Sequence, residues 1–254
     1  PTLGVGVGNV PSIIDSCADL KSAANKIKIS KSFDNSTSCS SENSIIILES
    51  IYKKFINILQ KEGGKLLNRE EKKILGKKLW DDKLILNRNL IAKKATKIAK
   101  MIGLNKAKYS KVRFLMVQET GVGKKFPFSR EKLSPILTIY KATNFNKAVQ
   151  LTKKILQHQG KGHSCSIHSK SEKNILKLGH ELPVCRIIVN QIHSYATGGS
   201  FDNGLPFSLS MGCGSWGNNI IDENLNYKHF LNIKNIIKKI DANEPSINEI
   251  FSSY

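Results

Sequence analysis

The sequence contains few aromatic residues and no long apolar run. Phe, Trp and Tyr make up 7% of its 254 residues, and no stretch approaches the ~18 apolar residues that a membrane-spanning helix needs. An integral membrane protein is therefore excluded. The start of the chain has neither a basic head nor an apolar middle, so it does not resemble a secretory signal. It also lacks a methionine, and we expect a fragment or a processed chain.

Cysteine is scarce and has no metal-binding or redox spacing. The five cysteines are odd in number and widely separated, and no C-x-x-C occurs, so neither a zinc ribbon nor a dithiol site is indicated. Without a signal sequence, they predict reduced thiols in the cytoplasm. No clear carboxylate accompanies His158, His163, Cys165 and His168, so we interpret these histidines as ordinary ones and expect no metal.

Positive charge is in excess, but little of it comes from arginine. The formal net charge is +20, with 40 Lys and Arg against 20 Asp and Glu, and only five of the cations are Arg. Nucleic-acid binders often concentrate cations on one face and use Arg to contact guanine. Here Lys occurs in nearly every segment, so we interpret the charge as a solvated surface. A basic nucleic-acid-binding protein is the alternative, and the same field favours an anionic substrate or a phosphate-bearing cofactor.

Strand and helix patterns alternate along the chain. Apolar β-branched runs predict strands at 12–14, 44–48, 112–117, 136–140, 164–167 and 186–189. Helical spacing is found at 20–30, 49–61, 69–80, 88–102, 145–157 and 171–179. This rhythm predicts an α/β fold with a largely parallel sheet. Residues 196–219 form a long glycine-rich loop, which is usually functional. Residues 229–240 have the apolar spacing of a helix but also permit a strand.

Two glycine clusters resemble phosphate-binding motifs but do not match them. In Gly4–Gly8 the third glycine of a dinucleotide fingerprint is replaced by Asn9, and no strand precedes the cluster. Gly121–Lys124 lacks the earlier glycine of a phosphate loop, and Lys125 occupies the hydroxyl position. Both clusters are interpreted as tight turns.

Cys39 differs from the other cysteines in its neighbours. Hydroxyl and amide residues surround it between Asn35 and Asn43, whereas a structural cysteine usually lies among apolar residues. Groups that donate to a thiolate would lower its pKa from ~8.5. Taken alone, this pattern favours an ordinary cysteine over a reactive one.

Several segments together resemble the CoA-acylating aldehyde dehydrogenases, most closely the type that acts on sulfoacetaldehyde. The matching segments, in the order in which the family has them, are Gly4–Pro11, Phe33–Asn43, Gly121–Gly123, Pro127–Ser134, Gly160–Cys165, Val189–His193, Gly199–Leu205 and Met211–Trp216. They extend over about residues 4–237. Their joint order carries the resemblance, since no single segment is decisive.

The resemblance implies a role for four residues. Cys39 matches the nucleophile, and Glu131 matches the acidic residue that holds the nicotinamide-side ribose. His163 and Asn203, in the Gly199–Leu205 loop, match positions near the acyl or CoA pocket. The implied cofactors are NAD or NADP, with CoA as co-substrate and a small, anionic aldehyde as substrate.

The resemblance also implies a chemistry. A thiolate attacks the aldehyde carbon, hydride leaves, and a thioester remains on the cysteine. Hydrolytic relatives use a glutamate general base whose position here is Val5, which cannot take a proton. The thioester is therefore expected to pass to a thiol such as CoA.

The resemblance further predicts three regions: 1–30 as the end of a cofactor-binding domain, 31–195 as the thiol-bearing catalytic domain, and 196–254 as a return segment with an oligomerisation strand. The family's main dinucleotide-binding units would lie upstream, so we expect these 254 residues alone to be almost inactive. A homo-oligomer is expected. A non-catalytic remnant acting in subunit association is a further alternative.

Overall fold

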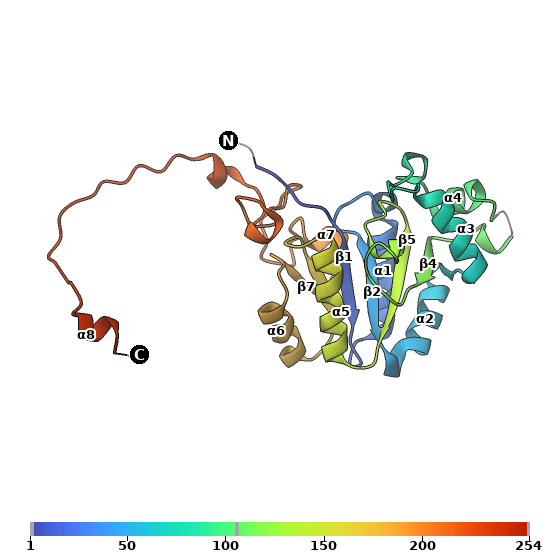
Figure 1. The fold of residues 1–254 in the computed structure, drawn as a ribbon, viewed down its shortest axis with the longest axis horizontal. Coiled ribbons are helices and arrows are strands. Elements are labelled where there is room, and N and C mark those ends of the chain that lie inside the picture. The colour runs from blue at the N-terminus through green and yellow to red at the C-terminus, as the bar shows by residue number, and fades with distance from the viewer. Residues whose placement is uncertain (1–2, 105–106, 253–254) are drawn as a thin grey trace.

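The computed structural model, which describes residues 3–104 and 107–252, has a central parallel sheet covered by helices on both faces (Figure 1). Seven strands lie in the order β3-β4-β5-β2-β1-β6-β7, and every neighbouring pair is parallel. The strands are β1 (Val10–Ile14), β2 (Glu42–Leu48), β3 (Gly64–Leu66), β4 (Phe114–Gln118), β5 (Ile136–Ala142), β6 (Cys165–His168) and β7 (Ile187–Val189). The predicted α/β class with a parallel sheet is confirmed.

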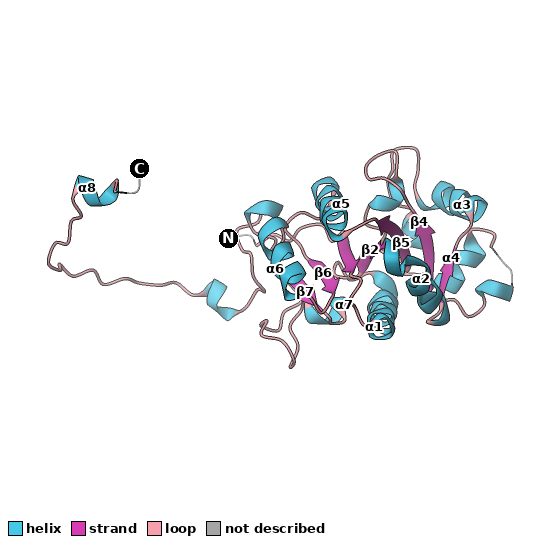
Figure 2. Cartoon of the chain, turned by 90° about the horizontal axis from the view of Figure 1, so that it is seen from below, coloured by secondary structure: helices cyan, strands magenta, loops and turns pink. Residues whose placement is uncertain are grey.

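Helices lie on both sides of this sheet, with α1 and α2 on one face and α5 and α6 on the other (Figure 2). The helices are α1 (Leu20–Ser32), α2 (Tyr52–Lys61), α3 (Arg69–Leu79), α4 (Ala95–Met101), α5 (Phe145–His158), α6 (Glu172–Glu181), α7 (His193–Ala196) and α8 (Ile247–Ile250). Adjacent residues of β1 serve different faces: Ile13 packs in the cluster under α5, and Ile14 in the cluster under α1 and α2. Burial on both faces explains why the central strands are continuous apolar runs.

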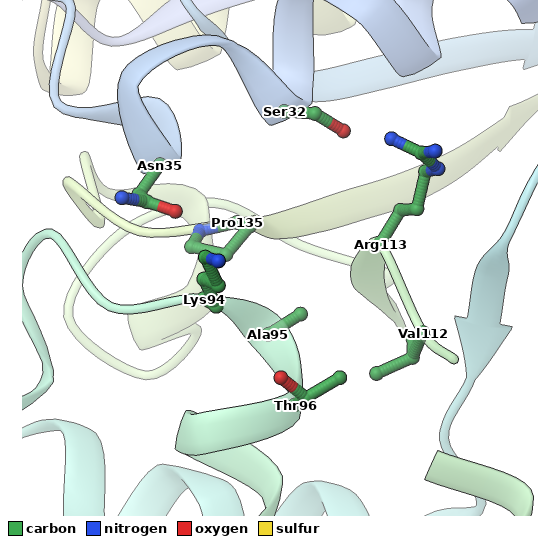
Figure 3. A pocket seen from close by; sticks show the side chains of 8 residues that line it. All are labelled: Ser32, Asn35, Lys94, Ala95, Thr96, Val112, Arg113 and Pro135. Atoms are coloured by element: carbon green, nitrogen blue, oxygen red, sulfur yellow. The ribbon is translucent and has the colours of Figure 1, made fainter. Parts of the chain in front are cut away.

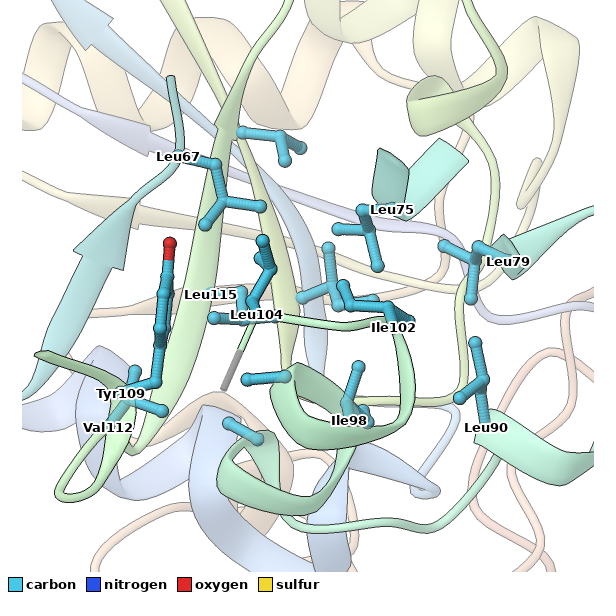
Figure 4. Packing of buried hydrophobic residues seen from close by; sticks show 14 of the residues in the cluster. Leu67, Leu75, Leu79, Leu90, Ile98, Ile102, Leu104, Tyr109, Val112 and Leu115 are labelled. Carbon is cyan, nitrogen blue, oxygen red and sulfur yellow. The ribbon is translucent and has the colours of Figure 1, made fainter. Parts of the chain in front are cut away.

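A third apolar cluster covers the β4 side of the sheet (Figure 4). Leu75 and Leu79 of α3 and Ile98 of α4 pack there against Leu115 of β4. Phe128 belongs to the same cluster, and its ring meets Trp80 edge-on at a centroid distance of 4.8 Å. This contact anchors the loop that leads to Glu131.

Two predicted segments differ in the structure. The expected helix over 88–102 is broken: a 3₁₀ turn covers Arg88–Leu90, and α4 starts only at Ala95. Between them Ala92 has a φ of 58°, and its N–H donates to the carbonyl of Leu133 at 3.1 Å. A tertiary hydrogen bond therefore interrupts a segment whose local pattern is helical. The short elements β3 and α7 were not predicted.

The C-terminal segment forms neither of the two structures that the sequence left open for 229–240, a helix or a strand. A 3₁₀ turn covers Tyr227–Phe230, and residues 231–246 then run away from the body without helix or strand (Figure 1). Ile237 is 92% exposed there. Since the chain offers this segment no apolar surface, the spacing alone does not produce a helix.

The predicted region 1–30 contributes β1 to the same sheet as strands of 31–195, and it contains most of α1, which packs on that sheet. The three-region division itself stays a prediction. Within residues 3–104 and 107–252, no helix is both long and apolar enough to cross a membrane.

Candidate active site

Cys39 lies in the short connection between α1 and β2, at the amino-terminal edge of the sheet. After α1 the backbone turns through Asp34, Asn35 and Ser36, whose φ angles are 46°, 49° and 62°. Left-handed conformations cost non-glycine residues about 1–2 kcal/mol, although Asp and Asn adopt them more readily. Three in succession reverse the chain sharply and bring Cys39 to the start of β2.

Most hydroxyl groups of this loop are used within it and do not face the thiol. Thr37 Oγ1 donates to the carbonyl of Asp34 at 2.7 Å, and Ser36 Oγ donates to the carbonyl of Lys31. Among the described residues, Ser40 supplies the one hydroxyl that interacts with the thiol, with an Sγ–Oγ distance of 4.0 Å. The expected ring of donors around Cys39 is therefore reduced to this hydroxyl and the backbone N–H of Cys39.

The expectation of a lowered thiol pKa is wrong for this chain. Burial raises the pKa of Cys39, and the nearby Glu131 and Cys213 raise it further, whereas the Ser40 hydroxyl lowers it. Desolvation and negative neighbours both disfavour the thiolate. The protein alone does not activate this cysteine.

The glycine cluster before β1 packs directly against the cysteine loop. A Cβ atom at Gly8 would lie 2.0 Å from the Cys39 carbonyl oxygen and 2.6 Å from its Cβ. A Cβ at Gly6 would lie 2.8 Å from the Sγ of Cys213. No helix follows this cluster, since it leads into β1. Its glycines are therefore needed for close approach to two cysteine segments.

Glu131 reaches the same region from the loop before β5. Its N–H donates to the Gln159 side chain at 2.9 Å. Asn43 joins this loop to the glycine cluster: its amide donates to the carbonyl of Gly8 at 3.0 Å, and its Oδ1 accepts from the N–H of Lys132 at 3.0 Å. Burial raises the pKa of Glu131 to about 7, against the Lys132 charge, the Gly8 N–H and Lys31, which lower it.

Buried charges beside Glu131 were missed by the sequence analysis. The Lys132 ammonium is fully buried and donates to the carbonyls of Phe128 at 2.9 Å and Arg130 at 2.8 Å. Lys31 and Glu42 are 1% exposed each, and burial lowers the pKa of Lys31 and raises that of Glu42, each opposed by its partner's charge. Glu42 lies where the cysteine loop meets a buried strand, and this position in the sequence could have indicated a buried charge.

His163 precedes β6 and is 2% exposed. Its Nδ1 lies 2.7 Å from the Ser164 hydroxyl. Burial and the Arg186 charge lower the pKa of His163 to about 4. Arg186 also donates to the carbonyls of His163 at 3.3 Å and Gly212 at 2.9 Å, which ties the His163 segment to the loop that contains Cys213.

No hydrogen bond between described residues joins His163 to Cys39. Both are coupled to Arg186, because the Arg186 charge lowers the pKa of His163 and Cys39 raises the pKa of Arg186. Asn203 is held by its own surroundings: its amide donates to Gln191 and to the carbonyl of Ala196, both at 3.1 Å, and its Oδ1 accepts from Leu205 at 3.1 Å. The structure therefore brings Cys39 and Glu131 together, places His163 next to that region through Arg186, and uses Asn203 within its loop.

A separate cavity of about 260 Å³ lies between the end of α1 and the start of α4 (Figure 3). Ser32, Lys94 and Arg113 line it, and none of the predicted site residues does. Within residues 3–104 and 107–252, no three His, Cys, Asp or Glu side chains converge where a metal ion could be held.

Comparisons with known proteins show which sequences and structures this chain is similar to. The sequence model of the aldehyde dehydrogenase family matches residues 2–208. A sulfoacetaldehyde dehydrogenase (acylating) from Cupriavidus necator is 47% identical over 254 residues, covering 100% of this chain and 51% of that protein. A succinate-semialdehyde dehydrogenase (acetylating) from Clostridium kluyveri is 35% identical, covering 99% of this chain and 55% of that protein.

The fold is also found in solved structures. The crystal structure of an acetylating aldehyde dehydrogenase from Geobacillus thermoglucosidasius matches with a TM-score of 0.90 and 36% identity, covering 97% of this chain and 54% of that one. The chain spans about half the length of the curated relatives it matches.

We predict that Gly8→Ala destabilises the chain by about 1–3 kcal/mol, because its Cβ would overlap the Cys39 backbone. Gly4→Ala is the matched control in the same cluster: its Cβ would meet only the Asn219 side chain at 3.6 Å, and we expect a change within about 0.5 kcal/mol. Urea unfolding measures both. Equal stabilities for the two variants would contradict the close-approach interpretation.

We predict that alkylation of Cys39 by iodoacetamide rises with pH to a midpoint above the ~8.5 of a free cysteine, because the thiolate is the reacting form and its formation is disfavoured here. Rates are measured by peptide mass spectrometry between pH 6 and 10, with Cys39→Ala confirming the assignment of the peptide. A midpoint at or below the free-cysteine value would show that an activating group is present.

Proposed function

Because this chain belongs to the aldehyde dehydrogenase family, we propose that it carries the thiol-dependent part of an acylating aldehyde dehydrogenase. The reaction is the NAD- or NADP-dependent oxidation of a small anionic aldehyde, of the sulfoacetaldehyde type, to its acyl-CoA. The observation that carries the proposal is the convergence of the Cys39 loop, the Gly8 segment and Glu131 at one edge of the sheet.

Cys39 is the nucleophile in this proposal. Its sulfur forms a bond to the aldehyde carbon, the carbonyl becomes an oxyanion, and loss of hydride leaves a thioester on the sulfur. Such an oxyanion needs preorganised donors. Burial raises the pKa of Cys39, so the thiol form is favoured in the free chain.

Glu131 fits the ribose of a nicotinamide dinucleotide. Its carboxylate is partly buried and, among the described residues, accepts a hydrogen bond only from the Gly8 N–H, so it can accept from sugar hydroxyls. A bound dinucleotide supplies the acceptor for the hydride. Among the described residues, neither glycine cluster leads into an α-helix that could hold the phosphates. We therefore expect the chain alone to oxidise aldehydes very slowly.

The acceptor of the acyl group is a thiol rather than water. Val5, which occupies the position of the general base in hydrolytic relatives, has no group that takes a proton. CoA has a usable thiolate fraction near neutral pH, so it competes with water. His163 is proposed to lie near this acceptor, and Asn203 to shape the neighbouring loop through its three hydrogen bonds.

We predict that acetyl-CoA acetylates the chain at Cys39, because thioester exchange needs neither aldehyde nor hydride acceptor. Intact-mass analysis should show one acetyl adduct, labile to hydroxylamine and absent in Cys39→Ala. Cys17→Ala, which removes an exposed thiol, is the control and should retain the adduct. Acetylation of another cysteine would overturn the site assignment, and no acetylation at all would refute CoA as the acyl partner.

The apolar C-terminal segment supports the proposed homo-oligomer, with residues 231–246 adding a strand to a second subunit. Ile233, Ile237 and Ile240 are 85%, 92% and 83% exposed, and contiguous exposed apolar side chains mark protein interfaces.

The five cysteines are all unpaired thiols, which agrees with the proposed cytoplasmic location.

We predict that removal of residues 231–254 lowers the molecular mass in solution to that of one subunit, whereas the full chain sediments as an oligomer. Analytical ultracentrifugation measures this. The double variant Lys238→Ala, Lys239→Ala, which leaves the apolar side chains in place, is the control and should sediment like the full chain. A monomeric full chain would contradict the proposal.

A further inference from the structure

Two buried histidines are joined through one serine behind the candidate site. His163 Nδ1 lies 2.7 Å from the Ser164 Oγ, and the same oxygen lies 2.9 Å from His193 Nε2. Ser164 and His193 are 0% exposed and His163 is 2% exposed. His193 is the first residue of α7, and α7 is held to α1 by the Ser194 N–H, which donates to the Ser30 hydroxyl at 3.0 Å.

In the part of the chain that the structure describes, the outer nitrogen of each ring has no hydrogen-bond partner. These atoms are His163 Nε2 and His193 Nδ1, both buried. Two neutral imidazoles and one hydroxyl bring three protons. The buried Ser164 hydroxyl has only the two rings as partners among the described residues, so its hydrogen lies in one of the two hydrogen bonds and a ring N–H lies in the other. One outer nitrogen therefore carries the third proton, and the other has a free lone pair.

Electrostatics decide which end carries the proton. Arg186 donates to the His163 carbonyl at 3.3 Å and is, after burial, the largest influence on the charge of that ring. Its effect on His193 ranks behind those of burial, His163 and His168. A nearby cation favours the lone pair and repels the N–H dipole, so the unpaired proton is placed on His193 Nδ1.

We propose that His193, acting through Ser164, holds the ring proton of His163 on Nδ1 and leaves His163 Nε2 as a buried proton acceptor. Ser164 then accepts from His163 Nδ1–H and donates to His193 Nε2. Ser164 and His193 are positioning residues. The use of this acceptor, to take the proton of the incoming CoA thiol, rests on the proposed function.

Because both rings are neutral, the tautomer decides which nitrogen of each ring can accept a proton. Burial, with Arg186, lowers the pKa of His163 to about 4, so the ring is uncharged near neutral pH. A neutral imidazole has one basic nitrogen, and its hydrogen-bond partner selects which one. Without Ser164 and His193, nothing among the described residues pairs with His163 Nδ1.

The ring tautomer is measured by long-range ¹⁵N–¹H correlation spectra of the full chain at pH 7, with His163→Gln assigning the signal. We expect a protonated Nδ1 in the natural sequence. Ser164→Ala and His193→Phe should shift a measurable share of the proton to Nε2. Ser164→Thr, which keeps the hydroxyl, and His193→Gln, which keeps an acceptor, should restore the natural pattern. His180→Phe, at an exposed histidine, should leave it unchanged.

Two results would overturn the proposal: a protonated Nε2 in the natural sequence, or a proton that stays wholly on Nδ1 in a folded His193→Phe variant. If Ser164→Ala fails to fold, the comparison of His193→Phe with His193→Gln still decides.

The functional part is tested separately by transfer of an acetyl group from Cys39 to CoA. We expect His193→Phe to slow transfer at least ~10-fold at pH 7, a part of the ~10²–10⁴ that a general base contributes. His193→Gln should recover it. Absence of transfer in the natural sequence would refute the proposed function while leaving the tautomer result intact. Normal transfer in His193→Phe would refute the positioning role.

Discussion

The candidate site depends on the close contact between a glycine segment and the backbone of the cysteine loop. No side chain fits between Gly8 and Cys39, so the two segments lie as near as backbones can. The Asn43 side chain then links this pair to the residue after Glu131, with one hydrogen bond to each segment. Buried amide groups that bind backbone in this way are costly to leave unpaired, and they fix the loops relative to the sheet. Cys39 is thus positioned by main-chain packing rather than by a charged partner.

The electrostatics of the region oppose ionisation of the thiol. Cys39 is shielded from water, faces negative groups and has one hydroxyl beside it. Two buried lysines, Lys31 and Lys132, lie instead next to Glu131 and Glu42, and Lys132 is further satisfied by backbone carbonyls. The positive charges of these two lysines therefore act on the neighbouring carboxylates. A resting thiol is less exposed to unwanted oxidation and alkylation than a permanent thiolate.

The sequence predicted the layers of the fold well. Strands such as β2 and β5 and helices such as α1 and α5 have patterns that tertiary contacts support, and the resemblance to the acylating aldehyde dehydrogenases is confirmed by its relatives. The local pattern failed where a distant contact decides the backbone, as at Ala92, which bonds to Leu133, and in residues 231–246, which are exposed.

The sequence named candidate site residues but did not predict their environment. Cys39 and Glu131 were named from motifs, and their roles stay predictions. The predicted direction of the Cys39 pKa shift was wrong, because composition does not tell where hydroxyl groups point. The hydroxyl groups of Ser36 and Thr37 donate to nearby backbone carbonyls. Likewise, no sequence pattern indicates that Ser164 bridges two rings that are 30 residues apart in the chain.

The order of the strands has a consequence for how the chain folds. The strand β1 occupies the interior of the sheet, between β2 and β6, and its pairing with β6 joins residues such as Ser12 and Ser166, which are far apart in the sequence. Non-local pairings of this kind slow folding, because a long loop must close before the contact forms. During synthesis, the edge of β1 that pairs with β6 stays open until β6 has left the ribosome. Such an edge is a template for pairing with other chains, so newly made molecules need protection from aggregation for much of their synthesis.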